Sequence, residues 1–142
     1  MSIQAATPYL ILGGNARQAI ALYERAFGAK TERVQRFGDF DQSCPAAQQD
    51  HIMHAELRFD GATIMLSDGA TAGAAKATPG TLEARVNIAL GSEDEAAARR
   101  SFEVLAEKGT VVEPLAMAPW GALFGIVADE LGIGWMFNVV AK

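Results

Sequence analysis

The chain has 142 residues, 50% of them hydrophobic, with 17 acidic and 12 basic side chains and a formal net charge of -5. This length and composition predict one compact domain that buries a substantial core. Nucleic acid and anionic membrane surfaces are not expected as partners, because both require clustered Lys and Arg. No apolar stretch approaches the roughly 20 residues of a membrane span, and the first residues lack the features of a signal peptide. We therefore expect a cytoplasmic protein.

The same succession of signals occurs in both halves of the chain. In each half, an extended apolar run is followed by glycine, a polar residue suited to cap a helix, an amphipathic stretch and a terminal glycine. The expected caps are Asn15 and Ser92, and the terminal glycines are Gly28 and Gly109. Each half therefore predicts a strand, a capped helix, a glycine stop and further strands.

Taken in chain order, the predicted elements form two βαβββ modules, at about residues 7–69 and 81–141. The first has strand 9–12, helix 16–27 and strands 29–37, 52–59 and 62–67; the second has strand 82–90, helix 93–108 and strands 110–117, 122–128 and 133–140. Asp60-Gly61 is a strong signal for the hairpin turn between two of these strands. The small, Gly-rich residues 70–80 are typical of a connector. The predicted fold class is α+β.

Residues 38–50 form a long polar segment without usable periodicity. Because this segment directly precedes strand 52–59, we predict an irregular, mobile lid beside a site on that strand. The segment contains the only cysteine, Cys44, which excludes an internal disulfide. Cys44 is interpreted as an isolated thiol in a loop, because no basic neighbour in the sequence would activate it.

Strand 52–59 presents the clearest candidate residues for chemistry. Its polar positions alternate with Met53, Ala55, Leu57 and Phe59, so the apolar face is expected to pack under the helix. His54 and Glu56 then share the other face. Their spacing suits two metal ligands, or a base with its orienting carboxylate. Alternatively, His54 is a hydrogen-bonded pocket residue and Glu56 pairs with Arg58 or Arg85.

The other candidate ligand-binding residues come from neighbouring strands; they are Met65, Arg85, Asn87, Trp120 and Met136. The Arg85 guanidinium is suited to a carboxylate or phosphate, or to a structural ion pair. Trp120 is expected either to wall an apolar pocket or to pack in the core or a dimer interface. The methionines would form an adaptable lining. Asn87 is expected on the side away from the helix, with Val86 on the helix side. Trp135 is interpreted mainly as a packing residue.

Short motifs occur along nearly the whole chain. They are Thr7-Pro8-Tyr9-Leu10, Gly14-Asn15-Ala16, Ala19-Ile20, Tyr23, Phe27-Gly28-Ala29, His54-Ala55, Ile64-Met65-Leu66-Ser67-Asp68, Trp120-Gly121, Phe124-Gly125, Asp129 to Gly132, Trp135-Met136 and Asn138. Their order and spacing resemble the vicinal oxygen chelate superfamily, which includes glyoxalase I, extradiol dioxygenases and the bleomycin and fosfomycin resistance proteins. Within it they are most similar to the PhnB-like branch. The resemblance implies two modules whose mixed sheets form a U-shaped barrel, commonly in a homodimer.

Metal-using members of this superfamily take one ligand, usually His or Glu, from each of four strands. The resemblance places these positions at about Thr7 or Pro8, at Met65, at about Arg85 or Val86, and at Met136. None is a good ligand for a hard divalent ion, so no metal is expected there. The chain also lacks a Gly-rich loop for a nucleotide-like cofactor, and no cofactor is expected.

Two functions from different classes remain. The first is a metal-free protein that binds a small, partly apolar ligand of unknown identity. The alternative is a lyase, isomerase or dioxygenase of the glyoxalase type that uses His54 and Glu56 with a metal at a shifted site.

The sheet edges of two modules, together with the resemblance, predict a homodimer. Light scattering at micromolar concentration should therefore give about twice the 15.0 kDa mass of the chain. A molar mass equal to that of one chain would contradict this assembly.

Overall fold

The computed structural model describes residues 5–69 and 86–140, and the chain divides into two compact units, Met1–Lys76 and Ala77–Lys142. The described elements of the first unit are β1 (Tyr9–Ile11), α1 (Ala16–Phe27), β2 (Lys30–Arg36), α2 (Phe37–Phe40), α3 (Ala46–Gln49), β3 (Ile52–Phe59) and β4 (Ala62–Ser67). Those of the second unit are β5 (Ile88–Ser92), α4 (Glu95–Ala106), β6 (Thr110–Met117), β7 (Leu123–Ala128) and β8 (Gly134–Val139).

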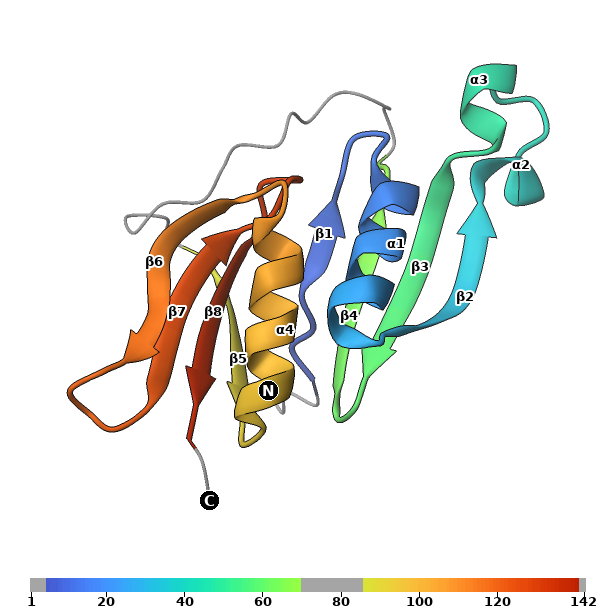
Figure 1. The fold of residues 1–142 in the computed structure, drawn as a ribbon. Coiled ribbons are helices and arrows are strands. Elements are labelled where there is room, and N and C mark those ends of the chain that lie inside the picture. Colours follow the sequence, from blue (N-terminus) through green and yellow to red (C-terminus); the bar gives the residue numbers. More distant parts are fainter. Residues whose placement is uncertain (1–4, 70–85, 141–142) are drawn as a thin grey trace. The chain divides into compact units, whose positions relative to one another are not determined.

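Each unit contains a four-stranded mixed sheet, with strand order β1-β4-β3-β2 in the first and β5-β8-β7-β6 in the second. In both sheets the first strand pairs in parallel with the last strand, whereas the other pairs are antiparallel. One long helix lies against one face of each sheet (Figure 1). The predicted α+β class and the repeated βαβββ order are confirmed.

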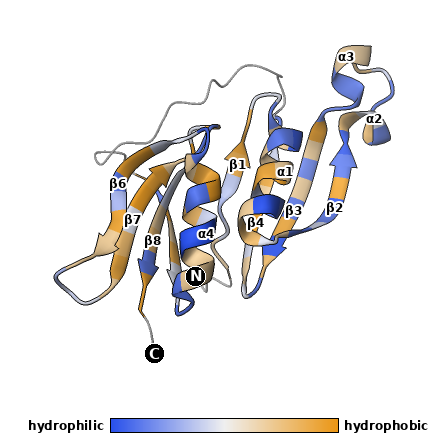
Figure 2. Ribbon diagram, viewed as in Figure 1, coloured by the Kyte–Doolittle hydropathy of each residue, from blue (hydrophilic) through white to orange (hydrophobic). Residues whose placement is uncertain are grey.

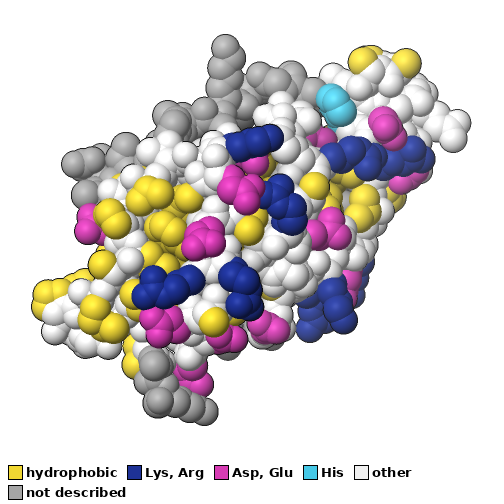
Figure 3. All heavy atoms as spheres, in the orientation of Figure 1, with side chains coloured by type: hydrophobic (Ala, Val, Ile, Leu, Met, Phe, Trp, Pro, Cys, Tyr) yellow, Lys and Arg dark blue, Asp and Glu magenta, His cyan; other side chains and the backbone are white. Residues whose placement is uncertain are grey.

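The long helices pack through amphipathic surfaces, and Figure 2 shows hydrophobic and hydrophilic residues alternating along both of them. The buried side chains of α1 recur at spacings of three and four residues; they are Ala16, Ala19, Leu22, Tyr23 and Ala26. In the second unit, Phe102 of α4 meets Phe137 of β8 edge to face, with ring centroids 5.3 Å apart. Acidic and basic side chains are intermixed over the solvent side of the helices (Figure 3). None of the helices in the described ranges is long and apolar enough to cross a membrane.

The predicted bounds of α1, β3, β4 and β6 match the structure, but the second unit begins differently. The cap of α4 is Asp94, whose side chain accepts a hydrogen bond from the Ala97 backbone N–H at 3.0 Å. The predicted cap Ser92 instead accepts from the Asp94 backbone N–H. Val86 precedes β5 and is 83% exposed, so its predicted place on the helix side is wrong. Residues 82–85 of the predicted strand lie outside the described ranges.

A buried carboxylate from a distant position caps α1. The predicted cap, Asn15, makes no side-chain capping bond. Instead, Asp68 is 2% exposed and accepts from the Ala16 N–H at 2.8 Å through Oδ1 and from the Ile52 N–H at 2.7 Å through Oδ2. One donor is the first residue of α1 and the other is the first residue of β3. Asp68, which directly follows β4, therefore joins both elements to the end of that strand.

Asp129 organises the turn before β8 in the second unit. Its Oδ1 accepts from the backbone N–H groups of Leu131 and Ile133, and its Oδ2 accepts from Trp135 Nε1 at 2.8 Å. Trp135 is fully buried, so its interpretation as a packing residue is confirmed. The turn assignment of Gly132 agrees with its φ of 83°, a conformation that favours glycine.

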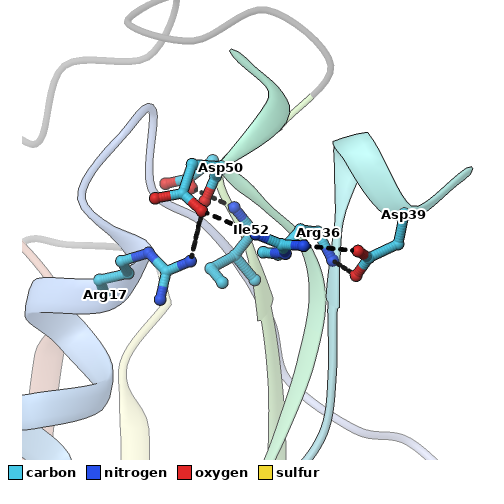
Figure 4. A network of polar contacts seen from close by, with 6 residues as sticks. Arg17, Arg36, Asp39, Asp50 and Ile52 are labelled. Carbon is cyan, nitrogen blue, oxygen red and sulfur yellow. Dashed lines mark hydrogen bonds and ion pairs between the residues drawn. The ribbon is translucent and has the colours of Figure 1, made fainter. Parts of the chain in front are cut away.

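The segment between β2 and β3 is more regular than predicted, since it contains the one-turn helices α2 and α3. Figure 4 shows the ion pairs at its base. Arg36 contacts Asp39 at 2.9 Å and Asp50 at 3.1 Å, while Arg17 of α1 contacts Asp50 at 3.5 Å. The hydrogen bonds from Arg36 lower the pKa of Asp39. Because these side chains are exposed, each pair contributes little to stability, and the lid remains a prediction.

Asp68→Asn should destabilise the protein, because an amide NH₂ would face a backbone donor where a carboxylate oxygen now accepts. We expect a loss of about 1–3 kcal/mol in the free energy of unfolding, measured by urea denaturation. Asp60→Asn makes the same chemical change at the exposed β3–β4 turn, where φ is 53° and Asn is tolerated. Equal stabilities of the two variants would contradict a capping role for Asp68.

Candidate functional site

The face of the first sheet opposite α1 carries a row of side chains from three strands. Glu56 of β3 pairs with Met65 of β4, which in turn pairs with Tyr9 of β1. His54 lies two residues before Glu56 and therefore shares its face. We call the surface formed by Tyr9, His54, Glu56 and Met65 the polar face. It unites three predicted site residues with Tyr9, which sequence reasoning assigned only to a motif.

Tyr9, His54 and Glu56 are linked by polar contacts and are called the triad below. The Tyr9 hydroxyl lies 2.9 Å from His54 Nδ1, and His54 Nε2 lies 3.3 Å from Glu56 Oε2. An ionised carboxylate only accepts hydrogen bonds, so Nε2 must donate to Glu56. In neutral His54, Nδ1 is then left as an acceptor for the Tyr9 hydroxyl. The contacts thus select the Nε2–H tautomer.

The charge of Glu56 is stabilised by its neighbours. The hydrogen bond from His54 lowers the pKa of Glu56 below its usual range, and the charge of Arg33 adds to this against the opposing effect of burial. The Glu56 side chain is 13% exposed, and Arg33 lies 3.4 Å from Oε2. The predicted pairing of Glu56 with Arg58 is wrong, since Arg58 lies 4.0 Å from Glu32 instead. Arg85, the other predicted partner, lies outside the described residues.

Arg33 reaches Glu56 from an irregular position of β2. Its φ is 53°, and the β2–β3 register shifts between Glu32 and Gln35. Bulges re-aim side chains, and left-handed non-glycine residues cost on the order of 1 kcal/mol or more. Periodicity in the sequence does not reveal such a shift, so Arg33 was not predicted as a site residue.

Exposed apolar surface borders the triad. Tyr9 is 46% exposed and Ile11, on the same side of β1, is 52% exposed. The Tyr9 ring also lies against the His54 ring, with centroids 5.6 Å apart. The polar face therefore combines a few oriented polar groups with apolar area open to solvent.

In the second unit, Trp120 marks a corresponding face opposite α4. Trp120 is 64% exposed, its ring meets Phe124 edge to face at 5.3 Å, and its Nε1 donates to Asn138 Oδ1 at 3.3 Å. Met136 lies on the same side of β8 as Asn138 and pairs with Ile126. The structure thus places predicted residues Trp120 and Met136 on one face. Asn138 shares this face, where the alternation of the last strand places it together with Met136.

Asn87 occupies a confined position just before β5. Its Oδ1 is buried and has no hydrogen-bond partner among the described residues. A Cβ built on Gly134 would collide with this oxygen, so the close approach requires glycine there. Because Asn87 precedes β5 (Ile88–Ser92), its expected place on the side away from the helix stays a prediction.

The donor chemistry of these residues does not fit the four-ligand metal site that the sequence resemblance would place here. Met65 and Met136 offer thioethers where a hard divalent ion requires oxygen or imidazole ligands. Within residues 5–69 and 86–140, no three His, Cys, Asp or Glu side chains are grouped to hold a metal ion. The triad supplies one imidazole and one carboxylate, which are already engaged with each other.

The repeated βαβββ modules identify the class of this protein. Residues 6–137 match the model of the Glyoxalase/Bleomycin resistance protein/Dioxygenase superfamily, and the chain belongs to this family. The family predicted from sequence motifs is therefore confirmed.

Individual relatives cover nearly the whole chain. Protein YjdN of Escherichia coli K12 is 34% identical over 146 residues, covering 96% of this chain and 95% of YjdN. The crystal structure of PA1353 from Pseudomonas aeruginosa is 35% identical with a TM-score of 0.80, covering 99% and 100% of the two chains. The Bacillus cereus PhnB protein, described as a putative 3-demethylubiquinone-9 3-methyltransferase, is 23% identical with a TM-score of 0.77, covering 96% and 100%. This last likeness shows the fold alone.

The lowered pKa of Glu56 gives a pH-dependent contribution to stability. Ionised Glu56 stabilises the folded protein above its unfolded-state pKa of about 4.3, and this contribution is lost as pH falls through the lower folded-state value. Wild type should therefore lose its stability advantage over Glu56→Gln as the pH falls below about 4.3. Urea denaturation of both proteins across this range measures the difference. A difference that is independent of pH would contradict the stabilised carboxylate.

Proposed function

We propose that the protein binds a small, partly apolar molecule on the polar face of its first sheet. The observation that carries this proposal is the triad, which ends at Tyr9, a half-exposed residue beside exposed Ile11. Small-molecule sites typically combine apolar surface with a few oriented polar groups. Binding would cover Tyr9 and Ile11, and burial of apolar area contributes about 25 cal/mol per Å².

The charges around the triad indicate the polar end of the ligand. Arg33 is 74% exposed although it contacts Glu56, so several of its N–H groups remain open to solvent. A planar guanidinium suits a carboxylate or another acceptor with two oxygens. We therefore expect an apolar body over Tyr9 and Ile11 with an acceptor group directed at Arg33.

The alternative is a metal-dependent lyase, isomerase or dioxygenase. The family match and the adjacent His54 and Glu56 favour it, since these side chains would supply two ligands. Two protein ligands are fewer than the three or four of typical metal sites, and both side chains are occupied by the triad. Binding without metal is therefore the preferred function.

The wider setting of this function follows the sequence predictions. We propose that residues 1–142 act as a single domain, that the chain works as a homodimer in the cytoplasm, and that neither nucleic acid nor membrane is a partner. The family match supports a small-molecule partner, because the superfamily includes bleomycin resistance proteins.

The binding proposal is tested by screening aromatic and aliphatic carboxylic acids by thermal shift in the presence of a chelator. A compound that stabilises wild type should bind Tyr9→Ala and His54→Ala at least about tenfold more weakly, or about 1.4 kcal/mol. His51→Ala is the matched control, because this second histidine lies outside the triad.

The alternative is tested in the same assay with Zn, Ni, Mn and Fe(II) salts in place of the acids. Stabilisation by a metal that disappears in His54→Ala but persists in His51→Ala would favour the enzyme. Compounds whose affinity is the same for wild type, Tyr9→Ala and His54→Ala would contradict binding on the polar face.

A further inference from the structure

We propose that the triad is a proton relay, with Tyr9 as the reacting residue, and that the site removes a proton from a weakly acidic O–H, S–H or C–H group of its ligand. This inference rests on the proposed binding of a ligand to the polar face. It adds a reaction to that binding, and it requires no metal.

The order of the three groups carries the inference. Glu56 is an acceptor, His54 donates to it through Nε2, and the remaining nitrogen, Nδ1, lies 2.9 Å from the Tyr9 hydroxyl. A carboxylate, an imidazole and a hydroxyl that contact one another in this order form the arrangement by which a base activates a hydroxyl group. The three residues come from β1 and β3, which are separated in the sheet by β4.

The exposure of the three side chains rises along the relay. The side chains of Glu56 and His54 are 13% and 23% exposed, and Tyr9 as a whole residue is 46% exposed. The charged end is therefore sheltered and the hydroxyl end faces solvent, where a ligand can reach it. Tyr23, the other tyrosine of the chain, is fully buried and has no such access.

The surrounding groups hold Glu56 in its ionised form. Glu56 is the negative group that contacts its Nε2, and Arg33 on β2 keeps Glu56 ionised from the far side. An imidazolium formed by proton uptake at Nδ1 would thus face a carboxylate that is already in place. Glu56 acts as a positioning residue, because it selects the tautomer and does not itself receive the proton.

The proposed step balances without an oxidant or a co-reactant. The Tyr9 O–H proton passes to His54 Nδ1 while the Tyr9 oxygen takes a proton from the ligand. At the relay, the Tyr9 O–H bond breaks and an N–H bond forms at His54 Nδ1. At the ligand, the bond to hydrogen breaks and a new Tyr9 O–H bond forms. The products are the ligand anion and a His54 imidazolium, and the reverse step returns the proton.

N-acetylimidazole tests the relay without the natural ligand. The Tyr9 oxygen would attack the acetyl carbon while its O–H proton passes to His54 Nδ1. An aryl ester would form as the bond from that carbon to the imidazole nitrogen breaks. The released imidazole would take a proton from water, and His54 would return its own proton to the solvent. Mass spectrometry of peptides gives the acetylation rate at Tyr9. Absence of acetylation at Tyr23 verifies in each variant that the protein is folded.

We expect His54→Gln to slow acetylation of Tyr9 at least about tenfold, in line with the contribution of a positioned base. His51→Gln is the matched control and should leave the rate unchanged. Glu56→Gln should also slow it, and Glu56→Asp should restore part of the rate because a carboxylate is again present. Equal Tyr9 rates in wild type and folded His54→Gln would overturn the relay.

The histidine tautomer gives a second readout that a merely structural role would not shift. The chain has two histidines, so ¹⁵N spectra of the neutral side chains are readily assigned. We expect the Nε2–H form of His54 in wild type and loss of that preference in Glu56→Gln. An Nδ1–H form in wild type would overturn the proposal. Both experiments are independent of the carboxylic acid screen, so failure of the relay and failure of ligand binding are distinguishable.

Discussion

The buried carboxylate of Asp68 is the interaction on which the first unit depends. Two backbone donors converge on it, one from the start of α1 and one from Ile52 at the start of β3. An unpaired donor at either place would be buried at a cost of about 1–3 kcal/mol. Because His54 follows Ile52 by two residues, the same carboxylate sets where the triad begins along the sheet. The Asp68 carboxylate therefore both caps α1 and fixes the start of the strand that carries the site.

Each side chain of the triad is oriented by a hydrogen bond or an ion pair to its neighbour. Glu56 directs one nitrogen of His54, and the Arg33 bulge directs a positive charge at Glu56. Left-handed backbone at Arg33 is unfavourable in isolation, and the surrounding strand pairing maintains it. The strained residue lies next to the proposed site, whereas regular pairing continues between β3 and β4.

Sequence periodicity was sufficient for the elements whose burial has a simple repeat. The bounds of α1, β3 and β4 follow from amphipathic spacing, alternation and the Asp60-Gly61 turn. The helix caps were less predictable, since the cap of α1 is 52 residues away in sequence. In the same way, His54 and Glu56 share a strand and were found together, but Tyr9 and Arg33 join them only through strand pairing. Contacts between strands depend on register, which local patterns do not specify.

The two modules share one register but have diverged in chemistry. In the first, the row across the sheet is Tyr9, Met65 and Glu56; in the second, the equivalent row is Ala89, Met136 and Ile126. Methionine is retained in both rows, while the hydroxyl and the carboxylate occur in only one. The same strand pairing therefore holds different side chains in the two units. One unit therefore carries ionisable groups in this row and the other carries apolar side chains, although the strands of the two units pair in the same way.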